Sequence, residues 1–420
     1  MHAAVIILVF VATYLGMAAG RLPWLRVDRT GIALLGVIAL LASEATTLDD
    51  LGADIDTSTL VLLFALMIVS AQFVETGFYD RCAEWIVARN RSPALLLATT
   101  IGVCGALSAL LANDILVVAL APLLIAGARA KGLDPRPFLI ALCGASNAGS
   151  AATLIGSPQN ILIGQLGNLS FASYLFTGAV PAVIGLLAFY AVIWFFWHDR
   201  IEGTVMAVTR EVPDVPHHPY DRNQTIKGLV AMVLLLGLFM TPLRREIGGL
   251  LIAGLLMSNR KITSRTMIAA VDWPLLLLFV CLFAITGALA DTGLPWSFLT
   301  TLDAHGLLPD SLVVLAPLTL FASNVIGNVP SVILLLQIWP NPPQGALYAL
   351  ATLSSLSGNL LLVGSVSNLI VSDRAEAYGV KLSFAEYARV GVPATLLSVG
   401  FAMFWLAWTG WLPWLPGGGN

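Results

Sequence analysis

Charge is scarce in this sequence, because only 11% of its side chains are charged whereas 58% are hydrophobic. Soluble domains carry roughly 25% charged residues, so the composition excludes an ordinary soluble protein. The four cysteines show no Cys-x-x-Cys spacing, which excludes a disulfide framework and a zinc site of that kind. A Walker A segment is also missing, so transport driven directly by ATP has no support in this chain. We expect neither an enzyme nor a nucleic-acid-binding protein.

Long apolar runs dominate what is present, and they recur from one end of the chain to the other. A membrane-spanning helix needs about 20 predominantly apolar residues to cross roughly 30 Å of hydrocarbon. Residues 3–20 lack the basic start of a signal peptide and are therefore expected to form the first span. The predicted fold is all-α, a polytopic membrane protein of about ten spans plus two re-entrant hairpins. We expect it in the inner membrane of a bacterium, in contact with the lipid bilayer.

The chain divides into two similar halves. Residues match at an offset of 208 to 216, as Asp56 matches Asp272 and Asn160 matches Asn368. An ordered series of such matches indicates an internal repeat. The predicted domains are a first membrane repeat over 1–198, a cytoplasmic linker over 199–223, a second membrane repeat over 224–412 and a C-terminal tail over 413–420.

Each half contains two interruptions of its apolar sequence. In the first half, a re-entrant hairpin is predicted over 94–127 and a broken helix at 156–160, which reads Gly-Ser-Pro-Gln-Asn. In the second half, the hairpin is predicted over 311–338 and the broken helix at 364–368, which reads Gly-Ser-Val-Ser-Asn. Paired interruptions in the two halves of a transporter point to a binding site near the middle of the membrane.

The positions of lysine and arginine predict the topology, since these residues favour cytoplasmic loops. With both termini outside, the linker and the loops that hold most of the basic residues fall on the cytoplasmic side. Only Arg244 and Arg245 break this rule, in a short outer loop. The assignment requires both hairpins to re-enter. It also turns the second repeat upside down relative to the first, as in transporters that work by alternating access.

Polar residues at the interruptions are the candidate substrate ligands. Asn113 and Asn328 fall at the predicted hairpin tips, where irregular backbone at membrane depth must be buried or must line a cavity. Helix N-termini at the breaks attract anions, and free carbonyl groups attract cations. The predicted ligands are Asn113, Asn160, Ser157, Asn328, Asn359, Ser365 and Asn368. The alternative is that these residues only cap kinked helices. Tyr174 and Tyr387 are interpreted as interfacial anchors.

Asp114 is the only acidic residue between Arg91 and Asp134, and it lies in an otherwise apolar segment. A carboxylate in such a setting is costly unless it is paired, hydrated or protonated. Asp114 is therefore the candidate proton carrier, and Val329 takes its place in the second repeat. The alternative is a structural aspartate that accepts hydrogen bonds from the hairpin backbone.

These motifs resemble those of the ion transporter superfamily, and the resemblance covers nearly the whole chain. Residues 112–114, which read Ala-Asn-Asp, are similar to the hairpin segment of arsenite efflux permeases. The loop at 156–160 is similar to the Gly-Thr-Pro-Pro-Asn loop of divalent anion/sodium symporters, and sodium/proton antiporters share the same fold. Neither hairpin tip reads Ser-Asn-Thr as in the anion symporters, which argues against dicarboxylate recognition.

The resemblance implies an elevator-like transport domain, often within a homodimer, and no cofactor other than a coupling ion, H⁺ or Na⁺. By position it implies two sodium sites. One consists of Ser108, Asn113 and Gly156, and the other of Ser323, Asn328 and Gly364. Ser108 and Ser323 are also small residues of the kind that simply permits close helix packing. In an arsenite pump, an accessory ATPase would be a further partner.

The leading functional hypothesis is proton-coupled efflux of arsenite or antimonite, in which Asp114 cycles between its protonated and charged forms. The first alternative is a sodium- or proton-coupled permease for a small inorganic or carboxylate anion, such as sulfate, phosphate or citrate. A sodium/proton antiporter is the next alternative. A channel or a non-transporting receptor of this fold belongs to a different class, and uncoupled conduction driven only by voltage would support the channel.

Overall fold

The computed structural model describes residues 2–19, 27–89, 92–202, 218–305, 307–339 and 341–416. Within these ranges the chain forms twenty α-helices and one 3₁₀ turn, without a strand, which confirms the predicted all-α class. Six of the described helices are long and apolar enough to cross a membrane by themselves: α1 (His2–Ala19), α4 (Thr57–Glu75), α7 (Asn113–Ala130), α10 (Phe171–Glu202), α14 (Trp273–Asp291) and α20 (Phe384–Trp408).

The other helices of the first half are α2 (Arg29–Ala42), α3 (Leu48–Ala53), α5 (Phe78–Arg89), α6 (Pro93–Ser108), α8 (Arg136–Ser150) and α9 (Pro158–Leu166). Those of the second half are α11 (Arg222–Phe239), α12 (Arg245–Met257), α13 (Ser264–Ala269), α15 (Leu294–Ala304), α16 (Leu312–Val325), α17 (Asn328–Ile338), α18 (Gln344–Ser357) and α19 (Val366–Ala377), with the 3₁₀ turn at Leu362–Gly364. The halves therefore correspond helix by helix, α1–α10 to α11–α20.

Corresponding helices also begin in the same way. The Asp56 side chain caps α4 by accepting from the Ser58 N–H group, and the Asp272 side chain caps α14 by accepting from the Leu275 N–H group. Aspartate is a preferred N-cap because its carboxylate satisfies a helix N–H group that has no partner within the helix. The two aspartates that correspond in the sequence thus also have the same structural role, as N-caps of corresponding helices.

The linker and the tail differ in part from their predicted extents. Helix α10 continues to Glu202, into the segment predicted as linker, and residues 203–217 lie outside the described residues. At the other end of the chain, the carbonyl groups of Pro413 and Trp414 accept from the N–H groups of Leu312 and Val313. The described part of the predicted tail is therefore attached to the start of α16.

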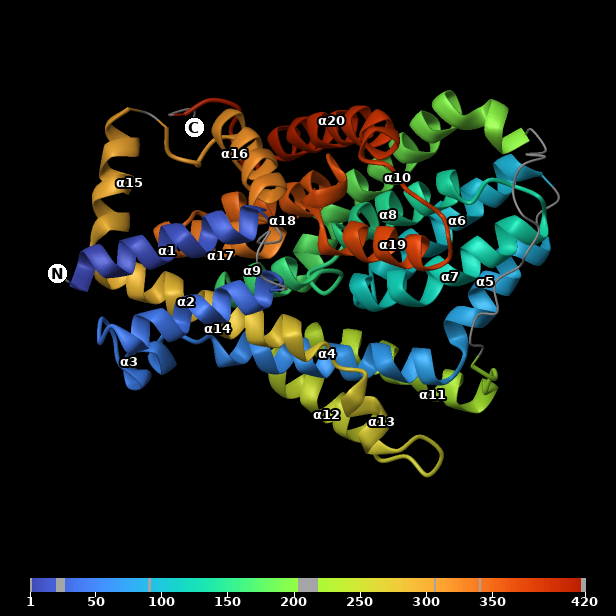
Figure 1. Ribbon diagram of the computed structural model, residues 1–420, viewed down its shortest axis with the longest axis horizontal. Helices are drawn as coiled ribbons and strands as arrows, with labels where there is room; N and C mark the ends of the chain where they lie inside the picture. The colour runs from blue at the N-terminus through green and yellow to red at the C-terminus, as the bar shows by residue number, and fades with distance from the viewer. Residues whose placement is uncertain are drawn as a thin grey trace.

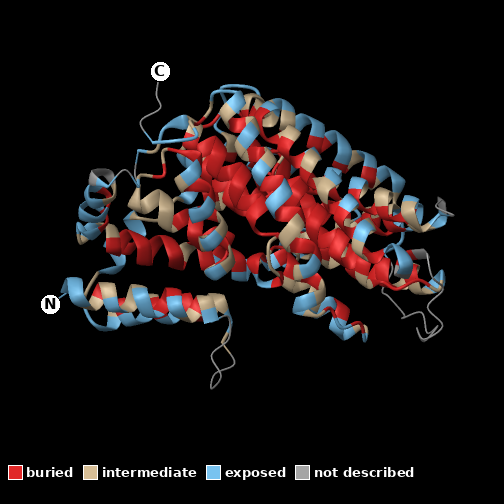
Figure 2. Ribbon diagram, turned by 90° about the horizontal axis from the view of Figure 1, so that it is seen from above, coloured by how far each residue is buried: buried red, intermediate tan, exposed pale blue. Residues whose placement is uncertain are grey.

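Two groups of helices make up most of the molecule (Figure 1). We call α1, α2, α4, α11, α12 and α14 the scaffold body, in which α4 packs against α12 and α14 packs against α2. We call α6–α10 and α16–α20 the hairpin body, in which α10 packs along α20 and each hairpin packs against the helix that follows it. Buried residues concentrate in the middle of the molecule, and exposed residues on its outer helices (Figure 2).

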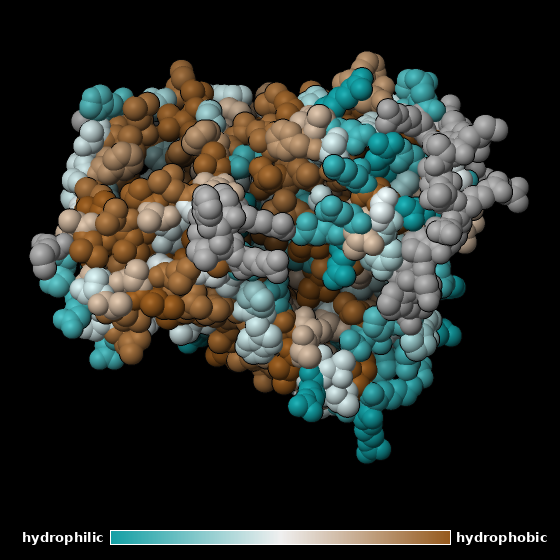
Figure 3. Space-filling view, viewed as in Figure 1, coloured by the Kyte–Doolittle hydropathy of each residue, from teal (hydrophilic) through white to brown (hydrophobic). Residues whose placement is uncertain are grey.

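The surface fits a protein embedded in lipid. Apolar side chains cover much of the face shown in Figure 3, and hydrophilic side chains gather towards the end that carries α5. Large apolar side chains are exposed on the outer helices, including Leu187 and Phe195 of α10, Val233 of α11 and Leu251 of α12. An apolar surface of this extent is unfavourable in water and favourable against hydrocarbon.

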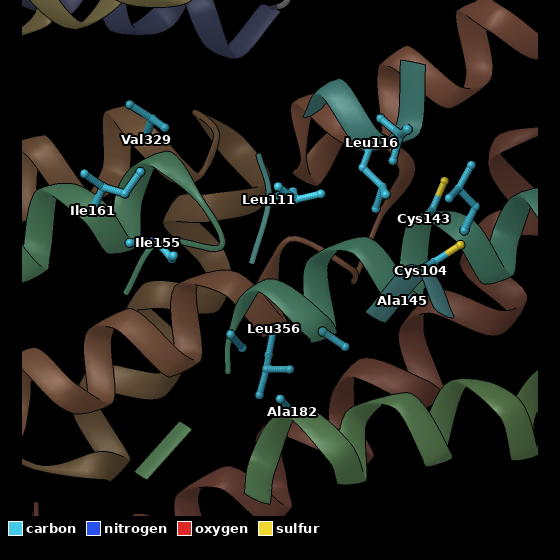
Figure 4. Packing of buried hydrophobic residues seen from close by; sticks show 14 of the residues in the cluster. Cys104, Leu111, Leu116, Cys143, Ala145, Ile155, Ile161, Ala182, Val329 and Leu356 are labelled. Carbon is cyan, nitrogen blue, oxygen red and sulfur yellow. The ribbon is translucent and has the colours of Figure 1, made fainter. Parts of the chain in front are cut away.

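The core of the hairpin body joins elements from both repeats. Leu111 of the first hairpin, Ile155 of the first break and Leu356 of α18 lie within one apolar cluster (Figure 4). Cys104 and Cys143 are buried in the same cluster as free thiols. Among the described residues, no group of His, Cys, Asp or Glu has the arrangement of a metal site.

Candidate functional site

The hairpin tips place Asn113 and Asn328 at corresponding points. Asn113 is the first residue of α7, which follows α6 after a short turn, and Asn328 is the first residue of α17, which follows α16. The second turn passes through Gly327 with φ of 99°, in the region that a side chain disfavours and glycine tolerates. Both asparagines are buried.

The broken helices end and restart as half-helices. Helix α8 ends at Ser150 and α9 begins at Pro158, whereas α18 ends at Ser357 and α19 begins at Val366. Ser157 and Ser365 are the N-caps of the second halves, and their side chains do not cap them. The first N–H groups of these half-helices are therefore left without a side-chain cap, and such groups carry partial positive charge.

Four helix starts meet at one small cavity, which we call the central cavity. It has a volume of about 40 Å³ and receives the first residues of α7, α9, α17 and α19. Its lining is Arg29, Asn113, Asp114, Pro158, Gln159, Leu275, Leu278, Gly327, Asn328, Val329, Pro330, Ser365, Val366 and Ser367. Of the predicted ligands, Asn113, Asn328 and Ser365 line it, and so does Asp114.

Asp114 is connected to the opposite repeat through one serine. The Ser367 hydroxyl donates to Asp114 Oδ1 at 2.5 Å, and Asn113 Nδ2 donates to Ser367 Oγ at 3.0 Å. The first hairpin tip is thus bonded to the second break through side chains alone. A change in the protonation of Asp114 would alter this contact, because a protonated carboxyl can donate where a carboxylate can only accept.

The side-chain oxygens of the two tip asparagines have no hydrogen-bond partner among the described residues. Asn113 Oδ1 and Asn328 Oδ1 are both buried, and neither accepts a hydrogen bond. Most buried polar atoms in folded proteins have a partner. Two buried acceptors at one small cavity therefore indicate a place where a hydroxyl group or a cation binds.

Asn160 and Asn368 are engaged in the backbone of the breaks. Asn160 Nδ2 donates to the carbonyl groups of Ser150 at 3.2 Å and Thr153 at 3.1 Å. Asn368 Nδ2 donates to the corresponding carbonyl group of Gly358 at 2.9 Å. Each asparagine therefore satisfies carbonyl groups that the interrupted helix leaves free.

Their side-chain oxygens bond across the two repeats. Ser355 Oγ donates to Asn160 Oδ1 at 3.1 Å, and Asn147 Nδ2 donates to Asn368 Oδ1 at 3.0 Å. Asn147 Nδ2 also donates to Asn359 Oδ1 at 2.9 Å. Asn160, Asn359 and Asn368 thus brace the breaks and do not line the central cavity, and their part in binding substrate stays a prediction.

The remaining predicted residues are placed as follows. Ser157 lines a larger cavity described below. Ser108 donates to the Ser146 carbonyl group at 2.5 Å, so its hydroxyl is used within the hairpin body. Ser323 Oγ is buried without a partner among the described residues, whereas Gly156 and Gly364 lie close to Ser108 O and Asn324 Oδ1, respectively. The two sodium sites stay predictions.

Tyr174 and Tyr387 are not interfacial anchors, so this interpretation is wrong. Both side chains are fully buried in the hairpin body. The Tyr174 hydroxyl donates to the Ala151 carbonyl group at 2.9 Å, at the end of α8. The sequence misled because an aromatic residue near a helix start is equally typical of an interface belt and of a buried contact to a broken helix.

Three cavity residues with polar side chains were not among the predicted site residues: Arg29, Gln159 and Ser367. Gln159 and Ser367 lie within the two break motifs, beside residues that were selected, so their position was a sufficient signal. Arg29 lies outside both motifs, among the basic residues that predict the cytoplasmic loops. Its match with Arg245 at an offset of 216, the offset that also relates Asp56 and Asp272, was the available signal.

Two further cavities lie on opposite sides of the central one. The larger, of about 450 Å³, is lined by α4, α5, α7, α9, α14 and α19, and it includes Asp80, Asp114, Ser157 and Arg374. The smaller, of about 270 Å³, includes Asp54, Asp56 and Gln337. Asp114, Pro158 and Leu275 line both the central and the larger cavity, so these two cavities are adjacent.

Asp54 lines the smaller cavity, and the effect of this position on its ionisation can be tested. Burial, with the neighbouring carboxylates of Asp291 and Asp50, raises the pKa of Asp54 above its ordinary value. Charging Asp54 therefore costs more in the folded than in the unfolded chain, and this cost is present at neutral pH and absent well below pH 4. We expect Asp54→Asn to raise the thermal unfolding midpoint in detergent at pH 7.5 and to leave it unchanged at low pH. A lower midpoint at pH 7.5 would contradict the raised pKa of Asp54.

Two inverted repeats, two hairpins and a small cavity at the starts of four helices define a secondary transporter. The model of the citrate transporter family matches residues 6–346, and the chain belongs to this family. The match confirms the resemblance to the ion transporter superfamily.

Several known proteins that are similar in sequence or in structure are named as transporters. An uncharacterized transporter from Mycobacterium bovis is 28% identical, with 96% of this chain and 97% of that protein covered. The silicon efflux transporter LSI3 of Oryza sativa is 27% identical, with 89% and 91% covered. The crystal structure of the Alcanivorax borkumensis YdaH transporter shares the fold, with a TM-score of 0.58 at 14% identity and coverage of 97% and 98%.

Proposed function

We propose that this protein exports a small hydroxylated oxyacid, such as arsenious acid, in exchange for protons. The observation that carries this proposal is the pair of buried acceptors, Asn113 Oδ1 and Asn328 Oδ1, which have no partner among the described residues and belong to two side chains that line one cavity. The hydroxyl groups of an uncharged oxyacid would donate to both. A fully deprotonated anion has no hydrogen to donate and would leave both acceptors unsatisfied.

The charge and the size of the central cavity support an uncharged cargo. Asp114 and Arg29 contribute one charge of each sign, so the lining as a whole favours neither an anion nor a cation. The helix starts around it offer N–H donors to the oxygen atoms of the cargo. A cavity of about 40 Å³ suits a molecule of a few heavy atoms better than a tricarboxylate. The name of the rice relative supports efflux of an element that forms an uncharged hydroxylated acid in water.

In this mechanism Asp114 carries the proton. It lines the larger cavity as well as the central one, so protons from one side of the membrane can reach it in the described state. The hairpin body would then move against the scaffold body and give the site access to the other side. We place the protein in a bacterial inner membrane as a multi-pass homodimer, with both termini outside and the larger cavity open to the cytoplasm.

Sodium coupling is the second candidate, and a specific observation favours it. Ser323 Oγ and Ser357 Oγ are buried without partners among the described residues, and both lie on helices that meet near the second hairpin tip. With Asn328 Oδ1 they would supply neutral oxygen ligands of the kind that a sodium ion accepts. The driving ion must therefore be determined directly.

The proposal is tested by flux into proteoliposomes that contain the full-length protein. Arsenious acid, silicic acid, sulfate and citrate are offered in turn, under a pH gradient or a sodium gradient. We expect pH-driven movement of the two uncharged oxyacids and no pH-driven movement of citrate or sulfate. Oxyacid movement that ignores pH and stops when sodium is removed would favour the sodium alternative. Citrate movement without oxyacid movement would refute the proposal.

A further inference from the structure

Arg29 and Arg245 occupy corresponding positions in the two repeats. Each is the first residue of the second helix of its repeat, α2 or α12, at an offset of 216. The residues that follow them also have corresponding contacts. Thr30 Oγ1 donates to the Pro274 carbonyl group at the start of α14, and Glu246 accepts from a serine in the first turn of α4. The repeat symmetry therefore makes the two arginines counterparts.

Their surroundings differ in the described state. Arg245 donates to the carbonyl groups of Gly164, at 2.8 Å, and Leu169, at the C-terminal end of α9. The last carbonyl groups of a helix lack partners within the helix and carry partial negative charge, so a guanidinium group stabilises them. Arg245 thereby ties the scaffold body to the hairpin body beside the smaller cavity, whose lining includes Leu166 and Gly167.

Arg29 makes no such contact among the described residues. It lies in the lining of the central cavity, beside the turn of the second hairpin. A Cβ atom built on Gly327 would stand 3.1 Å from a guanidinium nitrogen of Arg29. The arginine of the first repeat therefore faces a hairpin tip, whereas its counterpart caps a helix end.

The repeat symmetry also identifies the helix end that Arg29 would cap. Helix α9 ends with Leu169 N–H donating to the Gly164 carbonyl group, and α19 ends with Val380 N–H donating to the Ala375 carbonyl group. The carbonyl groups of Ala375 and Val380 are therefore the counterparts of those that Arg245 contacts. They lie at the C-terminal end of α19, which borders the larger cavity through Arg374.

We propose that Arg29 and Arg245 cap these two helix ends in alternation. In the described state Arg245 caps α9 and Arg29 faces the second hairpin tip. When access passes to the other side, Arg29 caps α19 through the carbonyl groups of Ala375 and Val380, and Arg245 turns to the first hairpin tip. Each arginine thus belongs to the substrate cavity in one state and holds the two bodies together in the other. This inference rests on the alternating access of the proposed function.

Cysteine accessibility tests the proposal without substrate or gradient. Single probes, Val118→Cys for the larger cavity and Gln337→Cys for the smaller, are introduced into the full-length chain after replacement of Cys82, Cys104, Cys143 and Cys281. A polar maleimide labels them in detergent micelles, where both sides are open to the reagent. We expect Arg245→Gln to raise labelling of Gln337→Cys relative to Val118→Cys by about tenfold, since charged hydrogen bonds that stabilise one state are lost.

The companion variants make the result specific. Arg29→Gln should shift the labelling ratio the other way, the double variant should lie between the two, and Arg245→Lys should give a smaller shift than Arg245→Gln. The control is Arg244→Gln, which removes the same charge from a neighbouring side chain that is 70% exposed and bonds to Glu246. We expect it to leave the ratio close to that of the parent.

Two results would overturn the capping proposal and leave alternating access standing. One is an equal shift of the labelling ratio in Arg244→Gln and Arg245→Gln. The other is a shift of the same sign in Arg29→Gln and Arg245→Gln. A Gln337→Cys probe that stays unlabelled in every variant, while Val118→Cys reacts, would show that the chain does not alternate. That outcome would refute the proposed function together with the capping proposal.

Discussion

Replacement of Asp114 by asparagine is expected to reduce pH-driven flux by at least about 100-fold. Among the described residues that line the central cavity, Asp114 is the only carboxylate, and asparagine cannot take up or release a proton in its place. Asparagine keeps the shape of the side chain and an oxygen that accepts from the Ser367 hydroxyl, so the contact between hairpin and break is preserved. Flux is measured in proteoliposomes with and without a pH gradient.

The same variant should retain exchange of substrate in the absence of a pH gradient, since the cargo ligands at the tips are unchanged. Asp373→Asn serves as the control, because it removes an exposed acid from α19 in the same hairpin body. Proton-driven flux that survives Asp114→Asn at the level of this control would assign the proton to another group. Loss of all exchange in Asp114→Asn would show that Asp114 acts in binding as well.

The second large effect concerns stability. We expect Gly156→Ala to lower the thermal unfolding midpoint by many degrees, because its Cβ atom would stand 2.5 Å from the Ser150 carbonyl oxygen and 2.8 Å from the Ser108 carbonyl oxygen. Both are backbone atoms at the end of α8 and in the first hairpin, so relief requires the break to open. Overpacking of this kind costs about 1–3 kcal/mol or more. Thermal unfolding in detergent measures the effect.

Two other glycines calibrate this result. Gly102 lies inside α6 with no atom within 4 Å of a built Cβ, so Gly102→Ala should slightly raise the midpoint. Gly364, the counterpart of Gly156, would meet the Asn324 side chain, which is hydrogen-bonded to Ser357 O and Leu361 N, and the Gly358 carbonyl oxygen at 3.0 Å, so Gly364→Ala should also lower the midpoint. A Gly156→Ala midpoint equal to that of Gly102→Ala would refute the close approach described at the first break.

The hairpins and breaks could be predicted because their signals are local. Glycine, proline and asparagine interrupt otherwise apolar runs, and such residues end or restart helices wherever they occur. The tip positions of Asn113 and Asn328 follow from the same signals. The internal repeat pairs each interruption in the first half with one in the second half. A hairpin or break predicted in one half therefore supports the same prediction at the matching place in the other.

The roles of the break asparagines could not be predicted in this way. Asn160 and Asn113 look alike in the sequence, since each lies at an interruption within apolar segments. The difference arises from distant parts of the chain, because Ser355 lies within reach of Asn160 Oδ1 and no described group lies within reach of Asn113 Oδ1. Arg29 was missed for a related reason, as its place beside Gly327 depends on how the two bodies meet.

The hydrogen bonds that cross between the two breaks constrain how the chain is made. The first repeat leaves the ribosome and enters the membrane before Ser355 and Asn368 have been synthesised. Until then Asn160 Oδ1 lacks its donor and Asn147 Nδ2 lacks both of its acceptors, Asn359 Oδ1 and Asn368 Oδ1, so the first broken helix inserts with its core unfinished. Neither repeat can complete its own core. The first broken helix therefore reaches its final hydrogen bonding only after α18 and α19 have been made and have packed against it.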